Sequence, residues 1–446
     1  MLHKRFTPIF LVGTLILLCG CNAKSASTTP ETANPAIADD NPANHGPLAI
    51  METEYGYYYN YNRTHYVKEH YQNNYTVKHT LQYYDKETQE HILLCNKPEC
   101  EHNGSSTCAA TYKNLSVINS LLYDNYIYVY ATEINQNLIS LNLYKIALDG
   151  SSLDKVGTVL EAENTIGEGI SAIKGKEYGI AEGFIIHRGY AYLPYYLRIG
   201  KASKGFMGGG LVQMNLETGE TKTIHEMPSM IASCPYNLRA YGDYVYVDLT
   251  STQRYVISED CMEYPPAFEA LKNKPQIHMI TPTRLYTIAA TRDAETKTYH
   301  APIFITSYDA ATGELVPEEG FDTDITYEEF KKLMISFSYE DMLVVVTGNR
   351  VIFYDSSPEN VGAKLGEIAV DYTLPEMEMH AVFFDKNIDF KITNDTLYCI
   401  RNPQDTYEYK AFANIEPYRT YEVLKCPVKD ILAGTGSWEK AFEQIP

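Results

Sequence analysis

The sequence is poor in tryptophan, in basic residues and in long apolar runs. Trp438 is the single tryptophan beside 39 tyrosines, which weakens a glycan-binding role based on stacking against an indole ring. Lysine and arginine total 37 against 57 acidic residues, and the net charge of −20 argues against nucleic acid and against electrostatic docking on anionic lipid. Beyond residue 20, no stretch reaches the ~20 apolar residues that a membrane span requires.

Familiar catalytic signatures are also missing. There is no G-x-S-x-G elbow, no H-E-x-x-H helix and no P-loop lysine motif. The run Asp322-Thr323-Asp324 lacks the glycine and the closing glutamate of an EF-hand loop. Gly208-Gly209-Gly210 precedes a strand and not a helix, so we interpret it as a flexible loop or hairpin turn, and His187 with Arg188 as a solvated corner. No local motif therefore assigns an activity.

The N-terminus has the features of an export signal. Lys4 and Arg5 precede an apolar run from Phe6 to Leu18, which is too short to span a bilayer comfortably. The following Leu18-Cys19-Gly20-Cys21 resembles the bacterial lipobox. The resemblance implies that residues 1–20 are removed and that Cys21 carries fatty acids such as palmitate, which anchor the protein on the extracytoplasmic face of the cell membrane. The alternative is ordinary secretion with unmodified cysteines.

Residues 21–47 are expected to form a flexible tether. They consist mainly of Ala, Ser, Thr, Asn and Pro, with almost nothing to bury, so packing does not offset the entropy of ordering them. We place the folded domain at residues 48–446. The hydrophobic fraction of the whole chain, 45%, is sufficient for a sizeable core.

The rest of the sequence repeats a loose pattern about seven times. Each unit has a Tyr-rich strand after a turn, then another strand that ends in a polar turn, with apolar and polar residues alternating. The spacing approaches the ~40–50 residues of a four-stranded propeller blade. The tyrosines are therefore interpreted mainly as structural. The expected strand pairs lie at 55–59 and 81–85, 126–130 and 143–146, 190–193 and 211–216, 244–247 and 254–258, 284–288 and 303–309, 342–346 and 351–355, and 396–400 and 421–426.

These strands and their Asn/Asp-Gly turns resemble those of β-propellers of the YWTD and TolB-like kind. Within that kind, they resemble a Tyr-rich type of unknown function from Gram-positive anaerobes. The resemblance extends over residues 50–446, although no strict YWTD tetrad occurs. It implies an all-β fold with about seven four-stranded blades, six or eight being the alternatives. Two stacked β-sandwiches are the competing architecture. Short inserted helices are expected, the clearest at 326–334, where Thr326 and Glu329 are placed as a capping box.

Three cysteines and a histidine lie close together in the sequence, at Cys95, Cys100, His102 and Cys108. In an extracytoplasmic compartment, a disulfide that closes this loop is the favoured interpretation. The alternative is a structural Zn²⁺ held by thiolates and the imidazole. The spacing Cys-x4-Cys-x-His-x5-Cys is not that of a standard zinc finger, and the single residue between Cys100 and His102 argues against both being ligands. No other cofactor is expected.

Other cysteines suggest further disulfides. Cys399 and Cys426 lie on strands of the same proposed last unit, and Cys234 and Cys261 flank the unit that begins near residue 241. Either pair requires Cα atoms within about 7 Å. Setting aside Cys19 and Cys21 leaves an odd number of cysteines, so one stays unpaired or three serve a metal.

The expected function is non-enzymatic binding of a ligand or an envelope protein by loops around the propeller channel. Inter-blade insertions near 60–80, 95–110, 198–210 and 262–280 would build that face. One alternative is a propeller hydrolase or lyase that acts on an envelope or carbohydrate substrate. Another is an accessory subunit of a transport or cell-wall complex. Acidic or histidine side chains buried at the channel mouth would favour the enzyme, because fold alone does not choose.

Overall fold

The folded part of the chain is seen in a computed structural model. It describes residues 42–45, 50–66, 75–102, 108–112, 115–135, 138–163, 176–180, 183–199, 206–230, 237–248, 253–264, 279–290, 293–296, 298–299, 302–331, 335–370, 390–401 and 421–444. All of them belong to the compact unit Ala36–Pro446. The export signal, Cys21 and most of the expected tether lie outside the described residues. Within the described part, no helix is long and apolar enough to cross a bilayer.

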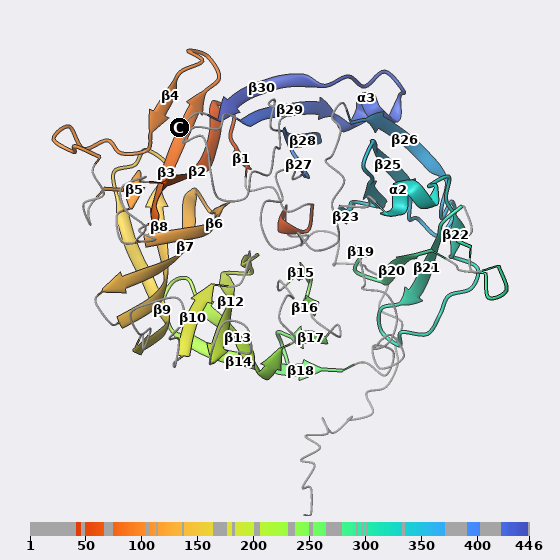
Figure 1. The fold of residues 1–446 in the computed structure, drawn as a ribbon, viewed down its shortest axis with the longest axis horizontal. Coiled ribbons are helices and arrows are strands. Elements are labelled where there is room, and N and C mark those ends of the chain that lie inside the picture. The colour runs from red at the N-terminus through yellow and green to blue at the C-terminus, as the bar shows by residue number, and fades with distance from the viewer. Residues whose placement is uncertain are drawn as a thin grey trace, which may run out of the picture. The chain divides into compact units, whose positions relative to one another are not determined.

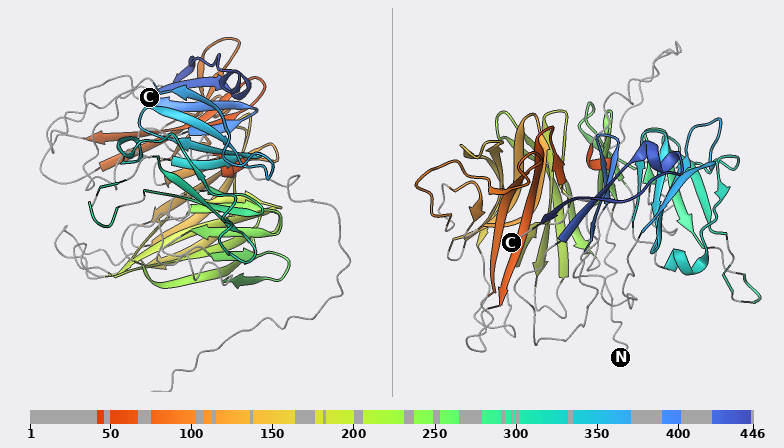
Figure 2. Two further views of the ribbon diagram at one scale, coloured as in Figure 1. Left: turned by 90° about the vertical axis from the view of Figure 1, so that its right-hand side faces the viewer. Right: turned by 90° about the horizontal axis from the view of Figure 1, so that it is seen from above.

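The described strands form seven antiparallel sheets, arranged as blades around a common centre (Figure 1). Strands that follow one another along the chain pair within one sheet, and the sheets themselves follow in chain order. Viewed from the side, the strands run roughly along the axis of the ring (Figure 2). The protein is therefore a seven-bladed β-propeller, as the sequence predicts, and the alternative of two stacked sandwiches is wrong.

The blades take their strands from successive parts of the chain. Blades 1 to 3 contain β1 (Ile50–Glu52), β2 (Gly56–Tyr66), β3 (Tyr75–Asp85), β4 (His91–Leu93) and β5 (Thr111–Tyr112); β6 (Leu115–Tyr123), β7 (Tyr126–Asn135), β8 (Leu138–Ala147) and β9 (Leu153–Glu163); and β10 (Lys176–Ile180), β11 (Ile185–His187), β12 (Tyr190–Ile199), β13 (Phe206–Asn215) and β14 (Thr221–Met230).

The remaining blades are built in the same way. Blades 4 to 7 contain β15 (Asn237–Tyr241), β16 (Tyr244–Asp248), β17 (Gln253–Val256) and β18 (Cys261–Glu263); β19 (Met279–Ile280), β20 (Arg284–Ala289), β21 (Phe304–Asp309) and β22 (Phe321–Asp322); β23 (Ile335–Tyr339), β24 (Met342–Val346), β25 (Arg350–Asp355) and β26 (Lys364–Ala369); and β27 (Phe390–Thr393), β28 (Thr396–Arg401), β29 (Tyr421–Pro427) and β30 (Glu439–Gln444).

The expected repeat units are confirmed as the second and third strands of the seven blades. Their tyrosines have the structural role that the sequence suggests, because the second strand of every blade except blade 6 carries a tyrosine that is almost completely buried. A tyrosine ring packs well on a pleated sheet, and it fills the space between two blades. These tyrosines are Tyr59, Tyr130, Tyr192, Tyr246, Tyr286 and Tyr398.

The polar turns after the third strands are fixed by their own side chains. The Asp85 carboxylate accepts hydrogen bonds from the backbone N–H groups of Glu87 and Thr88, at 2.9 and 2.8 Å. Asp309 and Asn215 make the equivalent bonds to the second and third residues after them. Asp and Asn favour turns because their short side chains replace missing backbone partners in this way. In these three blades, the Asp or Asn at the end of the third strand is therefore the local signal that reverses the chain.

Among the described residues, the buried apolar side chains form seven clusters, and each cluster joins two neighbouring blades. Between blades 3 and 4, for example, Tyr192 of β12 packs with Leu238, Val245 and Val247 of β15 and β16. Each sheet thus covers the apolar face of the next one. This arrangement explains why strands with alternating polarity form a ring and not a single flat sheet.

The ring closes between its first and last blades by side-chain packing. Among the described residues, the first and last sheets share no strand. Instead, Phe442 of β30 stacks on Tyr57 and Tyr84 of blade 1, with ring centroids 4.9 and 5.2 Å apart. Tyr59 and Tyr398 belong to the same buried cluster. Closure therefore depends on aromatic contacts and not on a shared hydrogen-bond ladder.

A short 3₁₀ helix, η2 (Pro42–His45), lies at the centre of the ring, drawn in red in Figure 1. It contacts β15, β23 and β27, the first strands of three blades. The buried Asn44 amide donates a hydrogen bond to the Ala240 carbonyl at 2.7 Å and accepts one from the Ala240 N–H at 3.0 Å. These residues fall in the expected tether, so the packed chain begins before residue 48.

The helix expected at 326–334 is present as α2 (Tyr327–Lys331), between blades 5 and 6. The Thr326 hydroxyl accepts a hydrogen bond from the Glu329 N–H at 3.2 Å, and the Glu329 carboxylate accepts one from the Thr326 N–H at 2.9 Å. The capping box is therefore confirmed. A second helix, α3 (Val428–Leu432), which the sequence did not reveal, lies between β29 and β30.

Two local interpretations are wrong. Gly208–Gly210 lie inside β13 and pair with Tyr195–Leu197 of β12. Glycine suits position 210, because the Tyr195 ring occupies the space that a side chain there would need. His187 is buried between blades 3 and 4, and its Nε2 lies 2.8 Å from the Gly242 carbonyl oxygen. Only Arg188 beside it is exposed.

The expected inter-blade insertions also need correction. Parts of 60–80 and 198–210 are strands of the β2–β3 and β12–β13 hairpins, so both segments belong to single blades. The segment 262–280 does connect blade 4 to blade 5. The segment 95–110, in contrast, interrupts a strand position within blade 1, and it holds the clustered cysteines.

Candidate metal centre

The Cys/His segment is an insertion in the outer strand of blade 1. β4 and β5 both pair with β3: Gln82 lies opposite Leu93, and Thr80 lies opposite Thr111. The intervening residue, Leu81, binds both ends of the insertion. Its carbonyl accepts a hydrogen bond from the Leu94 N–H at 3.1 Å, and its N–H donates one to the Ala110 carbonyl at 2.9 Å. The insertion therefore leaves and rejoins the sheet at one point, like an extended β-bulge.

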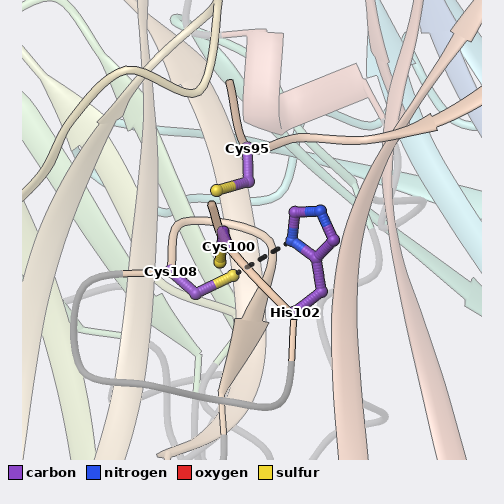
Figure 3. Close-up of side chains that lie close together, drawn as sticks. All are labelled: Cys95, Cys100, His102 and Cys108. Atoms are coloured by element: carbon purple, nitrogen blue, oxygen red, sulfur yellow. Dashed lines mark hydrogen bonds between the residues drawn. The ribbon is translucent and has the colours of Figure 1, made fainter. Parts of the chain in front are cut away.

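The structure brings the four predicted side chains together where this insertion leaves and rejoins the sheet, a place called here the neck of the insertion (Figure 3). Their possible ligand atoms, three sulfurs and one imidazole nitrogen, all lie within 4.8 Å of one another. The Cys108 sulfur lies 3.6 Å from Nδ1 of His102. Cys108 is fully buried, whereas Cys95, Cys100 and His102 are half-buried. The cluster is the only set of three or more His, Cys, Asp or Glu side chains with this proximity in the described part of the chain.

The tight spacing of Cys100 and His102 does not keep their side chains apart. His102 has a φ of +49°, in the left-handed region, so the chain reverses where the two side chains must face one point. Non-glycine residues seldom adopt this conformation, although histidine does so more often than most. Nothing in the local sequence indicates this backbone conformation, so the spacing alone does not reveal that the two side chains approach one another.

The insertion packs tightly against blade 2. Gly150, in the turn between β8 and β9, has a φ of +70°. A Cβ atom at this position would lie 2.7 Å from the Leu94 carbonyl carbon and 2.8 Å from the Cys95 nitrogen. Leu94 and Ala109, at the two ends of the insertion, belong to the buried cluster between blades 1 and 2. The cysteines are therefore held at the junction of two blades.

The thiols influence one another electrostatically. A backbone hydrogen bond from His102 lowers the pKa of Cys100, but desolvation and the neighbouring thiols of Cys108 and Cys95 outweigh it, so the net pKa is raised. Closely spaced thiols resist ionising together, because each negative charge disfavours the next. A divalent cation reverses this effect and stabilises the thiolates. Three thiols and one imidazole are the donor types that Zn²⁺ and other soft cations prefer.

The structure describes Cys95, Cys100 and Cys108 as thiols, with no disulfide among them. Cys399 and Cys426 are also thiols, both buried in the cluster between blades 6 and 7. Their register is diagonal, because Cys399 lies opposite Leu424 and Cys426 lies opposite Leu397. Diagonal neighbours are ~7–8 Å apart, which is unfavourable for a bridge. Cys261 is a half-buried thiol on β18, while its proposed partner Cys234 lies outside the described residues.

No protein-family model and no curated protein sequence matches this chain. Solved structures do match. Hsv2 of Kluyveromyces lactis shares 9% identity at a TM-score of 0.39, covering 90% of this chain and 98% of its own. A chain of the COPII outer coat vertex on membranes shares 8% at 0.39, covering 80% and 81%. An oligogalacturonate lyase in complex with manganese shares 9% at 0.36, covering 75% and 83%. Similarity this low carries no information on activity, and the fold assignment rests on the seven sheets themselves.

Proposed function

We propose that this protein is a lipoprotein, anchored through Cys21 on the extracytoplasmic face of the cell membrane. Its propeller binds a ligand or an envelope protein without changing it chemically. The anchor is supported by the lipobox-like Leu18-Cys19-Gly20-Cys21 and by the polar segment that follows.

The composition of the buried polar residues carries the non-enzymatic part of the proposal. In the described part of the chain, these are amides, hydroxyls, one histidine and one arginine, and none is Asp or Glu. The half-exposed Lys391 of β27 is a further ionisable group, whose pKa desolvation lowers to about 8. Hydrolysis or elimination by side chains needs a general acid or base that is positioned with its partners, most often His, Asp or Glu. The buried histidine, His187, is engaged with the Gly242 carbonyl and belongs to the packing between blades. This composition supports binding over catalysis.

The position of η2 favours binding at the loops around the ring. Its residues Asn44 and His45 contact inner strands of blades 4 and 6, with the His45 and Tyr339 rings 5.0 Å apart, edge to face. The protein's own chain thus takes up part of the centre of the ring. Loops supported by a rigid scaffold are the usual location of recognition residues.

The anchor is tested by labelling cells with an alkyne analogue of palmitate and fractionating them. The wild type and the matched control Cys19→Ser are expected to carry label and to sediment with membranes, whereas Cys21→Ser carries no label. Label retained by Cys21→Ser, or absent from the wild type, contradicts the anchor.

The binding role requires two measurements. Cross-linking on intact cells is expected to join the propeller reproducibly to one envelope component. Purified protein incubated with cell-wall and capsular polysaccharides is expected to release no product detectable by mass spectrometry. Enzyme-dependent products would refute the non-enzymatic role, and they would leave the anchor untouched.

A further inference from the structure

The geometry points to a structural zinc site: we propose that Cys95, Cys100, His102 and Cys108 bind one Zn²⁺ ion. The ion would close the neck of the insertion and hold the split outer strand of blade 1 against blade 2. This inference goes beyond the binding function proposed above and is independent of the lipid anchor.

The distances fit tetrahedral coordination. Zinc binds sulfur at ~2.3 Å and imidazole nitrogen at ~2.0–2.1 Å. Across a tetrahedral angle, these bond lengths place a sulfur and a nitrogen about 3.6 Å apart and two sulfurs about 3.8 Å apart. The Cys108 sulfur and the His102 Nδ1 are 3.6 Å apart, and no two of the four ligand atoms are separated by more than 4.8 Å. Side-chain movements of about 1 Å would bring the most widely separated ligand atoms to the spacing of a tetrahedral site.

The donor set favours zinc over a disulfide. Three thiolates and one imidazole form a recurrent closed set for structural zinc, with no coordination position left for water or substrate. A disulfide would use two of the three sulfurs and would leave the third, together with His102, without the common role that their convergence implies. The left-handed His102 backbone places the imidazole at the sulfurs, and a disulfide gives no reason for that conformation.

The location gives the metal a structural task. Both ends of the insertion meet Leu81, and the residues just outside the cysteines, Leu94 and Ala109, are buried between blades 1 and 2. Cys95 lies next to the Gly150 turn of blade 2. A metal that ties Cys95 to Cys108 therefore keeps β4 and β5 in register on β3. Removing it is expected to loosen blade 1 and the β8–β9 turn, and to leave the distant blade 5 unchanged.

The first test is the metal content of the full-length protein, purified in detergent under reducing conditions without added metal. Elemental analysis is expected to find one zinc per chain. Cys95→Ser, Cys108→Ser and His102→Gln are each expected to lose it, because removing a coordinating atom weakens binding by more than the ~10–100-fold effect of changing its outer-shell partners. Cys261→Ser, which changes a half-buried thiol outside the cluster, is the matched control and keeps its zinc.

The second test separates zinc from the competing chemistries. Chelator treatment of the wild type is expected to raise hydrogen exchange in β4, β5 and the β8–β9 turn, and zinc to restore protection, while blade 5 does not respond. An intact mass two protons lower, with a disulfide within 95–108 and no metal, overturns the proposal. So does iron in place of zinc, or failure of the reduced protein to take up Zn²⁺. Since these readouts do not depend on ligand binding or on Cys21, their failure is distinguishable from failure of the proposed function.

Discussion

Phe442 tests whether aromatic packing closes the ring. Its side chain is 2% exposed and stacks on Tyr57 and Tyr84 of blade 1. Replacing a buried Phe by Ala typically costs about 3–5 kcal/mol. Aromatic pairs contribute about 0.5–1.5 kcal/mol beyond burial. Phe442 also lies 5.2 Å from the Tyr59 ring, so we expect Phe442→Ala to fall at the upper end of the range.

The matched control is Phe337→Ala, which removes an equally buried ring from the interface between blades 6 and 7. Urea denaturation is expected to give comparable losses of stability for the two variants. Hydrogen exchange should distinguish them: Phe442→Ala should expose β1, β2 and β30, whereas Phe337→Ala should affect β23 and β27. A decrease of less than about 1 kcal/mol in the free energy of unfolding for Phe442→Ala is far below the usual cost of such a cavity. It would refute closure of the ring by these aromatic contacts. Unchanged exchange in β1 and β2 would refute it as well.

Three further predictions concern individual side chains. Burial alone would raise the pKa of Asp324, but hydrogen bonds from a lysine, an arginine and a tyrosine hold it at about 2, against 3.8 without these contacts. Its stabilising contribution is therefore complete above about pH 4 and is lost as the pH falls toward 2. In thermal melts, Asp324→Asn should have a lower melting temperature than the wild type at pH 7, and its melting temperature should fall less between pH 4 and pH 2. Parallel plots of melting temperature against pH would contradict this. Gly150→Ala should cost more stability than Gly189→Ala, because both have a positive φ but only a Cβ at Gly150 meets backbone atoms within 3 Å; equal melting temperatures would contradict the close packing of the insertion. Asn44→Ala should cost about 1–3 kcal/mol in urea denaturation, because it leaves polar groups of the buried Ala240 without a partner; an unchanged midpoint would mean that η2 does not stabilise the ring.

The sequence predicts the propeller because its signals are local and repeated. Alternating polarity, a tyrosine in the second strand and an Asp or Asn turn recur in almost every blade, and each signal acts within a few residues. The packing of η2 is different in kind. Asn44 binds Ala240, which is 196 residues away, and its neighbours read as polar tether. The Asn44 side chain takes the place of a neighbouring strand for Ala240, and such a contact between distant parts of the sequence leaves no periodic pattern around Asn44.

The cluster of three cysteines and His102 lies between these two cases. The residue types are visible in the sequence, and they did converge, but their position within the fold was not predictable. β4 is only three residues long, so nothing marks the cysteines as an interruption of a strand that resumes at β5. The left-handed conformation of His102, close to the sulfurs, is likewise a property of the folded chain. Composition therefore identifies the donors, and tertiary structure decides what they can hold.

The outer strand is the position in a blade where such an insertion disturbs the ring least. The fourth strand has a neighbour on one side only, so extra residues there interrupt a single ladder, and the inner strands that pack around the centre are unaffected. The cost falls on the two halves of the strand, β4 and β5, which must be kept in register on β3 although many residues separate them in the sequence. Leu81 binds both halves through one N–H and one carbonyl, and two hydrogen bonds alone are a weak restraint. The four converging side chains, if they bound a metal ion where the insertion leaves and rejoins the sheet, would restrain the two halves more strongly. The buried ends of the insertion would then stabilise the interface with blade 2.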